Sequence, residues 1–325
     1  MISPEKLKIG DEIRVIAPSR NLNIISQETI DIATTRLNDL GFKVSFGKNV
    51  SKSDGFLSSS IEDRLKDLHD AFVDKNVKAI LTVIGGYNSN QLIDIIDYEL
   101  IKQNPKIFCG YSDITALLTA FNTKANLITF YGPHFSSFGM KHGFNYSLDY
   151  FKKMLMESSS FEVSPSDTWS DDLWFLDQEK REFIKNEGMF SINEGSASGV
   201  ITGGNLSTFN LLTGTTYFPD LTDKILILEA HAEVKAFHFD RLLEQLTQQP
   251  SFTKLAGLVI GMFQKESNID KSTLINIIKN KSKLNNLPVI AGLNTGHITP
   301  IATLPLGGTA DITSKIDNCI FKLKV

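Results

Sequence analysis

The chain has 325 residues, with 33 lysines and arginines against 37 aspartates and glutamates, and 42% of its residues are hydrophobic. This length favours one large or two medium domains, and the hydrophobic content excludes an intrinsically disordered chain. The net charge of −4 argues against a nucleic-acid partner bound through its phosphates, because such binding requires a basic surface.

The first half of the chain alternates short apolar runs with segments in which apolar residues recur at helical spacing. Strands separated by helices indicate crossover connections and a parallel sheet with helices on its faces. The pattern predicts strands at 12–17, 42–46, 77–84, 106–110 and 127–131, and helices at 26–40, 61–73, 91–103 and 113–122.

The alternation stops in a polar stretch, residues 158–194, which we predict to be a linker or large loop. It contains both tryptophans of the chain, Trp169 and Trp174. A second α/β segment follows, so we predict domains at 1–157 and 195–325 joined by this linker. In the second domain, the expected strands are 198–201, 225–228, 255–260 and 288–291, and the expected helices are 205–212, 237–248 and 272–281.

The sequence lacks the motifs that are typical of metal sites, of common nucleotide-cofactor sites and of secreted or membrane proteins. The two cysteines, Cys109 and Cys319, are too far apart in sequence for a Cys-x-x-Cys motif, and no histidine pair has zinc-site spacing, so we predict no metal. No P-loop and no Gly-x-Gly-x-x-Gly turn is present, so no nucleotide cofactor of those types is expected. Without a signal peptide or a long apolar run, we predict a soluble, cytoplasmic protein with no membrane partner.

The motif Gly110-Tyr111-Ser112-Asp113 follows a predicted strand and leads directly into a predicted helix. This order places Ser112 on the connecting turn, where helix N–H groups can stabilise a developing negative charge, so Ser112 is a candidate nucleophile. The alternative is an ordinary helix cap, because serine is a preferred N-cap residue. The Gly-x-Ser-x-Gly pattern of α/β-hydrolases is not met, because Ile114 occupies the second glycine position.

Three further strand ends carry candidate groups. Gly85-Gly86 follows the predicted strand 77–84 and could let backbone N–H groups approach a ligand, although such turns are common in parallel sheets. Glu229 ends an apolar strand, where a carboxylate could orient an imidazole or simply face solvent. His297 lies in a loop between Gly296 and Pro300, and most loop histidines have no catalytic role.

Together these motifs resemble the LD-carboxypeptidase family of serine peptidases. The resemblance spans nearly the whole chain and is carried by Ala17-Pro18-Ser19, Asp54-Gly55-Phe56-Leu57, Gly85-Gly86-Tyr87, Gly110-Tyr111-Ser112-Asp113, Gly203-Gly204-Asn205-Leu206, Asp240-Arg241-Leu242-Leu243 and Gly296-His297. It implies an N-terminal parallel-sheet domain of flavodoxin-like or Rossmann-like type and a second, smaller α/β domain of swivelling β-barrel type.

The resemblance also implies site residues. The family uses a Ser-Glu-His triad, which Ser112, Glu229 and His297 match, and an oxyanion hole formed by backbone N–H groups, which Gly86 and Asp113 match. We further predict that Asn205 and Tyr87, which belong to matching motifs, contact the substrate.

Two branches of the family differ in substrate. One removes terminal D-alanine from cytoplasmic murein tetrapeptides, and the other, the microcin C self-immunity branch, cleaves the amide between an aminoacyl or peptidyl group and a nucleotide. The loop around Trp174 resembles the immunity branch, in which a loop aromatic stacks on adenine. We therefore predict an aminoacyl-nucleotide hydrolase with Trp174 as the stacking residue, although both tryptophans could instead anchor the loop.

The alternative within the family is murein tetrapeptide cleavage. The alternative from another class is a non-catalytic protein of two α/β domains that closes over a small ligand. In each case the expected partner is a small molecule, and we expect the protein to form a homodimer.

Overall fold

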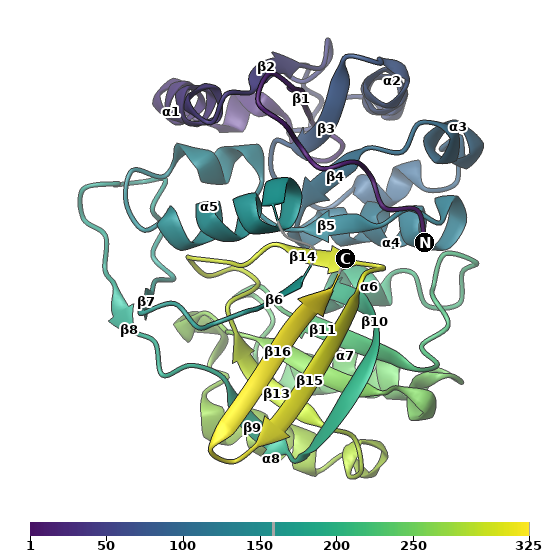
Figure 1. Cartoon of the computed structure of the whole chain (residues 1–325), viewed down its shortest axis with the longest axis vertical. Coiled ribbons are helices and arrows are strands. Elements are labelled where there is room, and N and C mark those ends of the chain that lie inside the picture. Colours follow the sequence, from purple (N-terminus) through teal and green to yellow (C-terminus); the bar gives the residue numbers. More distant parts are fainter. Residues whose placement is uncertain (158–159, 325) are drawn as a thin grey trace.

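The computed structural model describes residues 1–157 and 160–324 and contains two separate β-sheets, each covered by helices. Figure 1 shows the two sheets as two halves of the molecule, with both termini near the boundary between them. The predicted α/β class, with a parallel sheet in one domain and a second sheet in another, is confirmed.

The N-terminal sheet has the strand order β14-β5-β4-β3-β1-β2. Its five N-terminal strands are parallel, and the sixth, β14, comes from the C-terminal part of the chain and runs antiparallel to β5. The strands are β1 (Glu12–Ile16), β2 (Lys43–Phe46), β3 (Val77–Thr82), β4 (Ile107–Gly110), β5 (Thr129–Tyr131) and β14 (Leu304–Leu306).

The helices that accompany this sheet begin where the sequence offers caps. The Ser60 side chain accepts a hydrogen bond from the Asp63 N–H at 3.1 Å at the start of α2, which satisfies one of the free N–H groups of the first turn. The α-helices in the described part of this half are α1 (Gln27–Asp39), α2 (Ile61–Val73), α3 (Tyr98–Gln103), α4 (Thr115–Ala125) and α5 (Asn145–Lys152).

The predicted continuous helix at 91–103 is wrong. The segment forms a short 3-10 turn at Ser89–Leu92, and α3 begins only at Tyr98. The Asp97 side chain accepts from the Leu100 N–H at 2.9 Å, so Asp97 starts a new helix rather than continuing the first. Aspartate is a better N-cap than helix-interior residue, and here that local preference outweighs the apolar spacing.

The second sheet has the order β6-β16-β15-β10-β11-β12-β13-β9. Its central strands β10 to β13 are parallel, and antiparallel strands extend it on both sides. The strands are β6 (Ser160–Glu162), β9 (Phe190–Asn193), β10 (Gly195–Asn205), β11 (Lys224–Glu229), β12 (Gly257–Gly261), β13 (Val289–Leu293), β15 (Thr309–Lys315) and β16 (Asn318–Lys324). The α-helices that accompany this sheet are α6 (Leu206–Asn210), α7 (Ala236–Thr247) and α8 (Lys271–Lys279).

The segment predicted as a linker carries more regular structure than expected. Residues 158–159 lie outside the described residues. Strands β6 and β9, which both fall within the predicted linker, form the two edge strands of the second sheet. A separate two-stranded sheet is formed by β7 (Thr168–Trp169) and β8 (Ile184–Lys185). These strands are very short, which is why no apolar period reveals them in the sequence.

The two sheets bring the carboxyl ends of several strands together. Strand β5 of the first sheet ends at Tyr131, which contacts Glu229 at the end of β11. Thr115, which follows β4 in the chain, contacts Asn205 at the end of β10. In the described part of the chain, no helix is long and apolar enough to cross a membrane.

Candidate active site

Ser112 lies on the turn between β4 and α4, as predicted. Its backbone φ is +62°, in the left-handed region that residues with a side chain seldom adopt, and it begins a 3-10 turn at Ser112–Ile114. The alternative that Ser112 is a helix cap is wrong, because its side chain makes no capping hydrogen bond. Instead the hydroxyl lies 2.9 Å from Nε2 of His297. A constrained backbone at such a turn is typical of a functional residue.

Glu229 is the last residue of β11, and its side chain is fully buried. Its Oε2 accepts a hydrogen bond from Nδ1 of His297 at 2.7 Å. Its Oε1 accepts from the Tyr131 hydroxyl at 2.6 Å and from Nδ2 of Asn205 at 2.9 Å. Burial by itself raises the pKa of Glu229, but its contacts with His297, Tyr131 and Asn205 outweigh burial and hold that pKa below its ordinary value.

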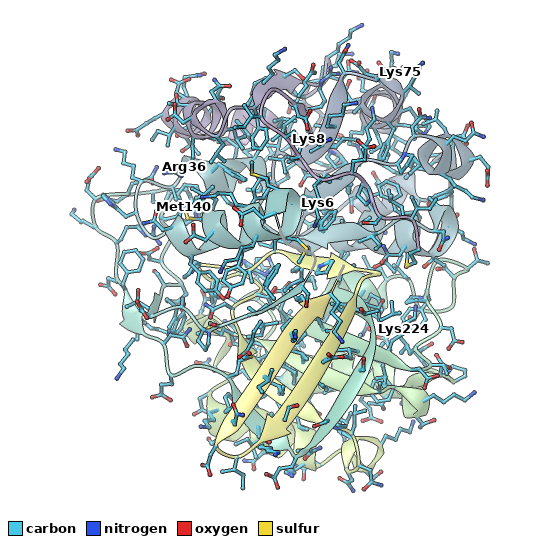
Figure 2. All side chains as sticks on the ribbon, in the orientation of Figure 1. Lys6, Lys8, Arg36, Lys75, Met140 and Lys224 are labelled. Carbon is cyan, nitrogen blue, oxygen red and sulfur yellow. The ribbon has the colours of Figure 1, made fainter. Side chains whose placement is uncertain are left out.

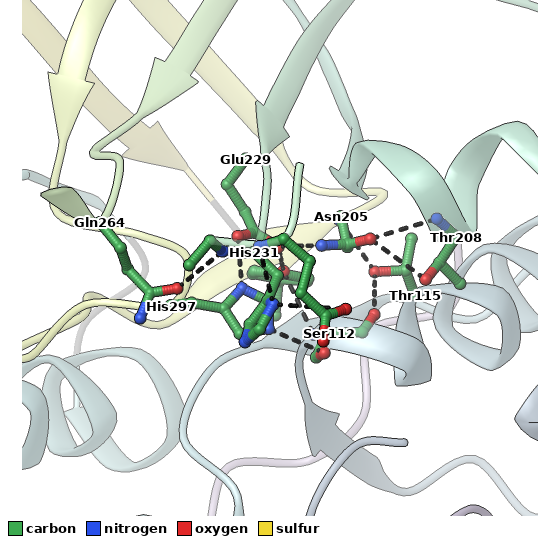
Figure 3. Close-up of polar contacts among 11 residues, drawn as sticks. Ser112, Thr115, Asn205, Thr208, Glu229, His231, Gln264 and His297 are labelled. Atoms are coloured by element: carbon green, nitrogen blue, oxygen red, sulfur yellow. Dashed lines mark hydrogen bonds and ion pairs between the residues drawn. The ribbon is translucent and has the colours of Figure 1, made fainter. Parts of the chain in front are cut away.

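His297 lies between these two residues and contacts both (Figure 3). Because an ionised carboxylate can only accept, Nδ1 of His297 carries the proton, and Nε2 is free to accept from the Ser112 hydroxyl. The loop approaches Glu229 so closely that a Cβ on Gly296 would lie 2.7 Å from the carboxylate oxygen. Only glycine permits this approach, so the Gly-His pair serves to place the imidazole.

Tyr131 and Thr115 connect the two domains at this point. The Tyr131 hydroxyl, on β5, donates to Glu229 and accepts from the Ser112 N–H at 3.2 Å. The Thr115 hydroxyl donates to the Ser112 carbonyl at 2.7 Å and accepts from the Asn205 N–H at 3.0 Å (Figure 3). Sequence reasoning missed both residues, because these contacts depend on how the two sheets meet.

Replacing Tyr131 with phenylalanine is expected to lower the free energy of unfolding by about 1.5–3 kcal/mol at neutral pH, because a buried carboxylate loses a donor. Chemical denaturation measures this change. Since the folded-state pKa of Glu229 is lowered, the contribution is present above the ordinary glutamate pKa of about 4.3 and is lost as the pH falls below it. The difference between variant and wild type should therefore shrink in acid.

Tyr150→Phe is the matched control, because Tyr150 is also buried but its hydroxyl bonds to the backbone of Glu162 and Ser164 and to the Tyr146 side chain, with no carboxylate among these partners. If Tyr150→Phe lowers the free energy of unfolding as much as Tyr131→Phe does, or more, the Tyr131 hydroxyl has no special importance for stability.

Backbone N–H groups beside Ser112 are available to a ligand. In the described part of the chain, the N–H groups of Gly86 and Asp113 donate to no other protein group. A Cβ on Gly85 would lie 2.9 Å from the Ser112 Cβ, so this turn packs directly against the candidate nucleophile. The two N–H groups can therefore bind the oxygen of a carbonyl that Ser112 attacks.

A cavity of about 450 Å³ opens at Ser112 and His297. Trp174, which is partly buried, and the largely exposed Tyr87 line it, as do Asn205 and the N–H-bearing residues Gly86 and Asp113. Trp169 is not among the lining residues; it pairs with Ile184 in the small sheet. Of the two tryptophans, the one predicted to stack on the substrate, Trp174, is therefore the one that lines the cavity.

Two other histidines line the cavity without joining the Ser112 contacts. His134 is buried, and burial followed by the nearby His297 lowers its pKa to about 3, so its imidazole is neutral at physiological pH. The His231 ring packs edge-on against His297 with centroids 4.8 Å apart, and burial followed by His297 lowers its pKa as well. Neither contacts Ser112, so His297 is the imidazole placed to take its proton.

The arrangement can perform nucleophilic acyl transfer. A hydroxyl, an imidazole of fixed tautomer and two free N–H groups line one cavity, and the buried carboxylate of Glu229 contacts the imidazole. Among the described residues, no group of histidine, cysteine, aspartate and glutamate side chains is placed to hold a metal ion.

Family models match both halves of the chain. Residues 13–132 match the LD-carboxypeptidase N-terminal domain, and residues 198–312 match the LD-carboxypeptidase C-terminal domain.

Three curated relatives are similar along almost their full length. YocD of Bacillus subtilis is 48% identical, with 94% of each chain covered. The microcin C7 self-immunity protein MccF of Escherichia coli is 29% identical over 93% of this chain and 90% of its own. The murein tetrapeptide carboxypeptidase of Pseudomonas aeruginosa is 24% identical over 93% of each chain.

Two solved structures extend the comparison. An MccF-like protein from Bacillus anthracis strain Ames has a TM-score of 0.99 and 51% identity, with 100% of each chain covered. MccF in complex with aspartyl sulfamoyl adenosine has a TM-score of 0.90 and 27% identity, over 100% of this chain and 99% of that one.

Proposed function

The chain belongs to the LD-carboxypeptidase family of serine peptidases, and from this we propose that it hydrolyses the amide that joins an aminoacyl or peptidyl group to a nucleotide. The proposal that the protein is a hydrolase with Ser112 as nucleophile rests on two hydrogen bonds, from Ser112 to His297 and from His297 to Glu229. The predicted alternative of a non-catalytic binding protein is set aside, because the family consists of peptidases.

In the proposed mechanism, His297 takes the proton of the Ser112 hydroxyl as Ser112 attacks the carbonyl carbon. The N–H groups of Gly86 and Asp113 hold the oxyanion, and Glu229 keeps His297 in the required tautomer and stabilises its protonated form. The protonated imidazole then donates to the leaving nitrogen, so the amide bond breaks. Water, activated by His297, releases the acyl group from Ser112.

Trp174 supports a nucleotide as the leaving group. Its indole lines the cavity from a loop near His297, where the backbones of Ser170 and Thr299 pair through hydrogen bonds of 2.7 and 2.8 Å. An aromatic ring on such a loop can stack on a base, which contributes about 1–3 kcal/mol. The solved MccF complex with aspartyl sulfamoyl adenosine supports the same class of substrate.

The test compares two substrates with the purified protein. We expect release of the amino acid from an aminoacyl-sulfamoyl adenosine, measured by liquid chromatography, at a higher kcat/KM than release of D-alanine from a muramyl tetrapeptide. If only D-alanine is released, the nucleotide proposal is wrong and the murein alternative holds.

Replacing Trp174 with alanine is expected to raise KM for the nucleotide substrate roughly 5- to 150-fold and to spare the tetrapeptide, because only the nucleotide offers a base for stacking. Steady-state kinetics on both substrates measures the change. Trp169→Ala, which alters the tryptophan outside the cavity, should leave the ratio of the two activities unchanged. Equal losses on both substrates in Trp174→Ala would remove the stacking argument.

A further inference from the structure

Arg20 lines the cavity and has no anionic partner in the described part of the chain. Among the described residues that line the cavity, it is the only lysine or arginine. Its guanidinium carbon lies 5.2 Å from the ring centroid of Tyr87, and no carboxylate in the described chain lies within ion-pair distance of it. A partly buried guanidinium placed this way is available to an anion from outside the protein.

The carboxylates that line the cavity are engaged elsewhere. Asp113 accepts from the Ser19 hydroxyl, Asp171 from the Lys265 N–H, Asp172 from the Arg181 guanidinium, and Glu233 from the Tyr87 hydroxyl. None of these carboxylates forms an ion pair with Arg20, so the positive charge of Arg20 is available to a ligand in the cavity.

The position of Arg20 is fixed by the same backbone that forms the predicted oxyanion hole. Its N–H donates to the Gly85 carbonyl at 3.3 Å, and a Cβ on Gly86 would lie 3.0 Å from the Arg20 Cγ. The preceding Ser19 is fully buried, and its hydroxyl and carbonyl are held by Asp113 and the Ser58 hydroxyl, each at 2.6 Å. The Arg20 side chain therefore begins beside the Gly86 N–H, close to the carbonyl that Ser112 would attack.

The two substrates considered for this family share one chemical feature near that carbonyl. In an aminoacyl-phosphoramidate nucleotide, the scissile nitrogen is bonded directly to a phosphorus that carries an anionic oxygen. In the sulfamoyl analogue, the scissile nitrogen is itself acidic, and its negative charge is shared with the sulfonyl oxygens beside it. In a murein tetrapeptide, the scissile nitrogen is one carbon away from the terminal carboxylate of D-alanine. Both substrates thus carry a negative charge at or beside the scissile nitrogen, on the leaving-group side of the bond that breaks.

We propose that Arg20 binds this negative charge, so that the site selects amides that are anionic at or next to the scissile nitrogen, on the leaving-group side. The planar fork of a guanidinium matches carboxylate, sulfamate and phosphoryl oxygens. The Tyr87 ring beneath it limits the freedom of the guanidinium and helps to aim it. This inference rests on the proposed function, because it assumes hydrolysis at Ser112.

The experiment compares charged and neutral forms of each substrate in wild type and in Arg20→Met. The charged substrates are aminoacyl-sulfamoyl adenosine and a muramyl tetrapeptide. The neutral counterparts are the aminoacyl amide of 5′-amino-5′-deoxyadenosine and the same tetrapeptide with a terminal carboxamide. We expect Arg20→Met to lower kcat/KM about 10- to 100-fold on the charged form that the wild type cleaves, as for loss of a charged hydrogen bond, and to leave the neutral form nearly unchanged.

Lys75→Met is the matched control, because it removes an exposed positive charge at the far end of the N-terminal domain from Met140, which lines the cavity (Figure 2). It should leave the charged-to-neutral ratio unchanged. Circular dichroism and the melting temperature establish that each variant is folded.

The outcomes separate this inference from the proposed function. Equal losses on charged and neutral forms in Arg20→Met would overturn the role of Arg20 while leaving hydrolysis intact. Wild-type cleavage of the tetrapeptide alone would overturn the nucleotide proposal, and the tetrapeptide pair would still test Arg20. A wild-type protein that cleaves neither charged substrate would overturn both.

Discussion

Replacing Ser112 with alanine is expected to reduce kcat/KM about 10⁴- to 10⁶-fold, as in other serine triads, and to leave the fold intact. The Ser112 side chain has one hydrogen-bond partner, Nε2 of His297, so its loss removes the nucleophile and little else. Progress curves on aminoacyl-sulfamoyl adenosine measure the rate, and thermal unfolding measures the fold.

The matched control is Ser196→Ala, because the Ser196 hydroxyl on β10 contacts only Thr313, at 3.3 Å, far along the strand from Asn205. It should retain wild-type turnover. Near-wild-type activity in Ser112→Ala would exclude Ser112 as the nucleophile, whatever the geometry of its neighbours.

Replacing Glu229 with glutamine is expected to reduce kcat by about 10⁴-fold, the size of effect known for replacing the carboxylate of a serine triad by its amide. The carboxylate holds the proton of His297 on Nδ1, which leaves Nε2 able to accept from Ser112. A glutamine amide can donate to Nδ1 and so favours the opposite tautomer, in which Nε2 carries a proton and cannot act as a base.

In the same orientation, the neutral amide oxygen replaces a carboxylate oxygen as the acceptor for the Tyr131 hydroxyl and the Asn205 amide, so two charge-assisted hydrogen bonds become weaker neutral ones. We therefore also expect a lower free energy of unfolding, which denaturant titration measures. Glu266→Gln serves as the control, because that side chain is largely exposed and pairs only with Lys235. A kcat of Glu229→Gln within ten-fold of wild type would show that Glu229 does not orient His297.

Much of this site was predictable because parallel strands place their carboxyl ends at one edge of a sheet. Ser112 after β4 and Glu229 at the end of β11 follow apolar runs that the sequence displays, and the predicted contacts of both with His297 are present. Their catalytic roles remain predictions, as do the domain boundaries, the cytoplasmic location and the homodimer.

Other parts were hidden because they depend on contacts between distant segments. Tyr131 looks like an ordinary core residue of β5, and only the meeting of the two sheets brings its hydroxyl to Glu229. Strand β14 belongs to the C-terminal part of the chain but pairs with β5 of the N-terminal sheet, and no local sequence pattern indicates this pairing. The break before α3 was missed for a local reason, because a capping aspartate at position 97 outweighed the apolar period.

The central claim, that Ser112 carries the acyl group during amide hydrolysis, is tested most directly by rapid-quench mass spectrometry of the protein turning over an aminoacyl-sulfamoyl adenosine. We expect a transient mass increase of one aminoacyl group on the peptide that contains Ser112, and no such adduct in Ser112→Ala. An acyl adduct on a different residue, or undiminished turnover by Ser112→Ala, would contradict the mechanism.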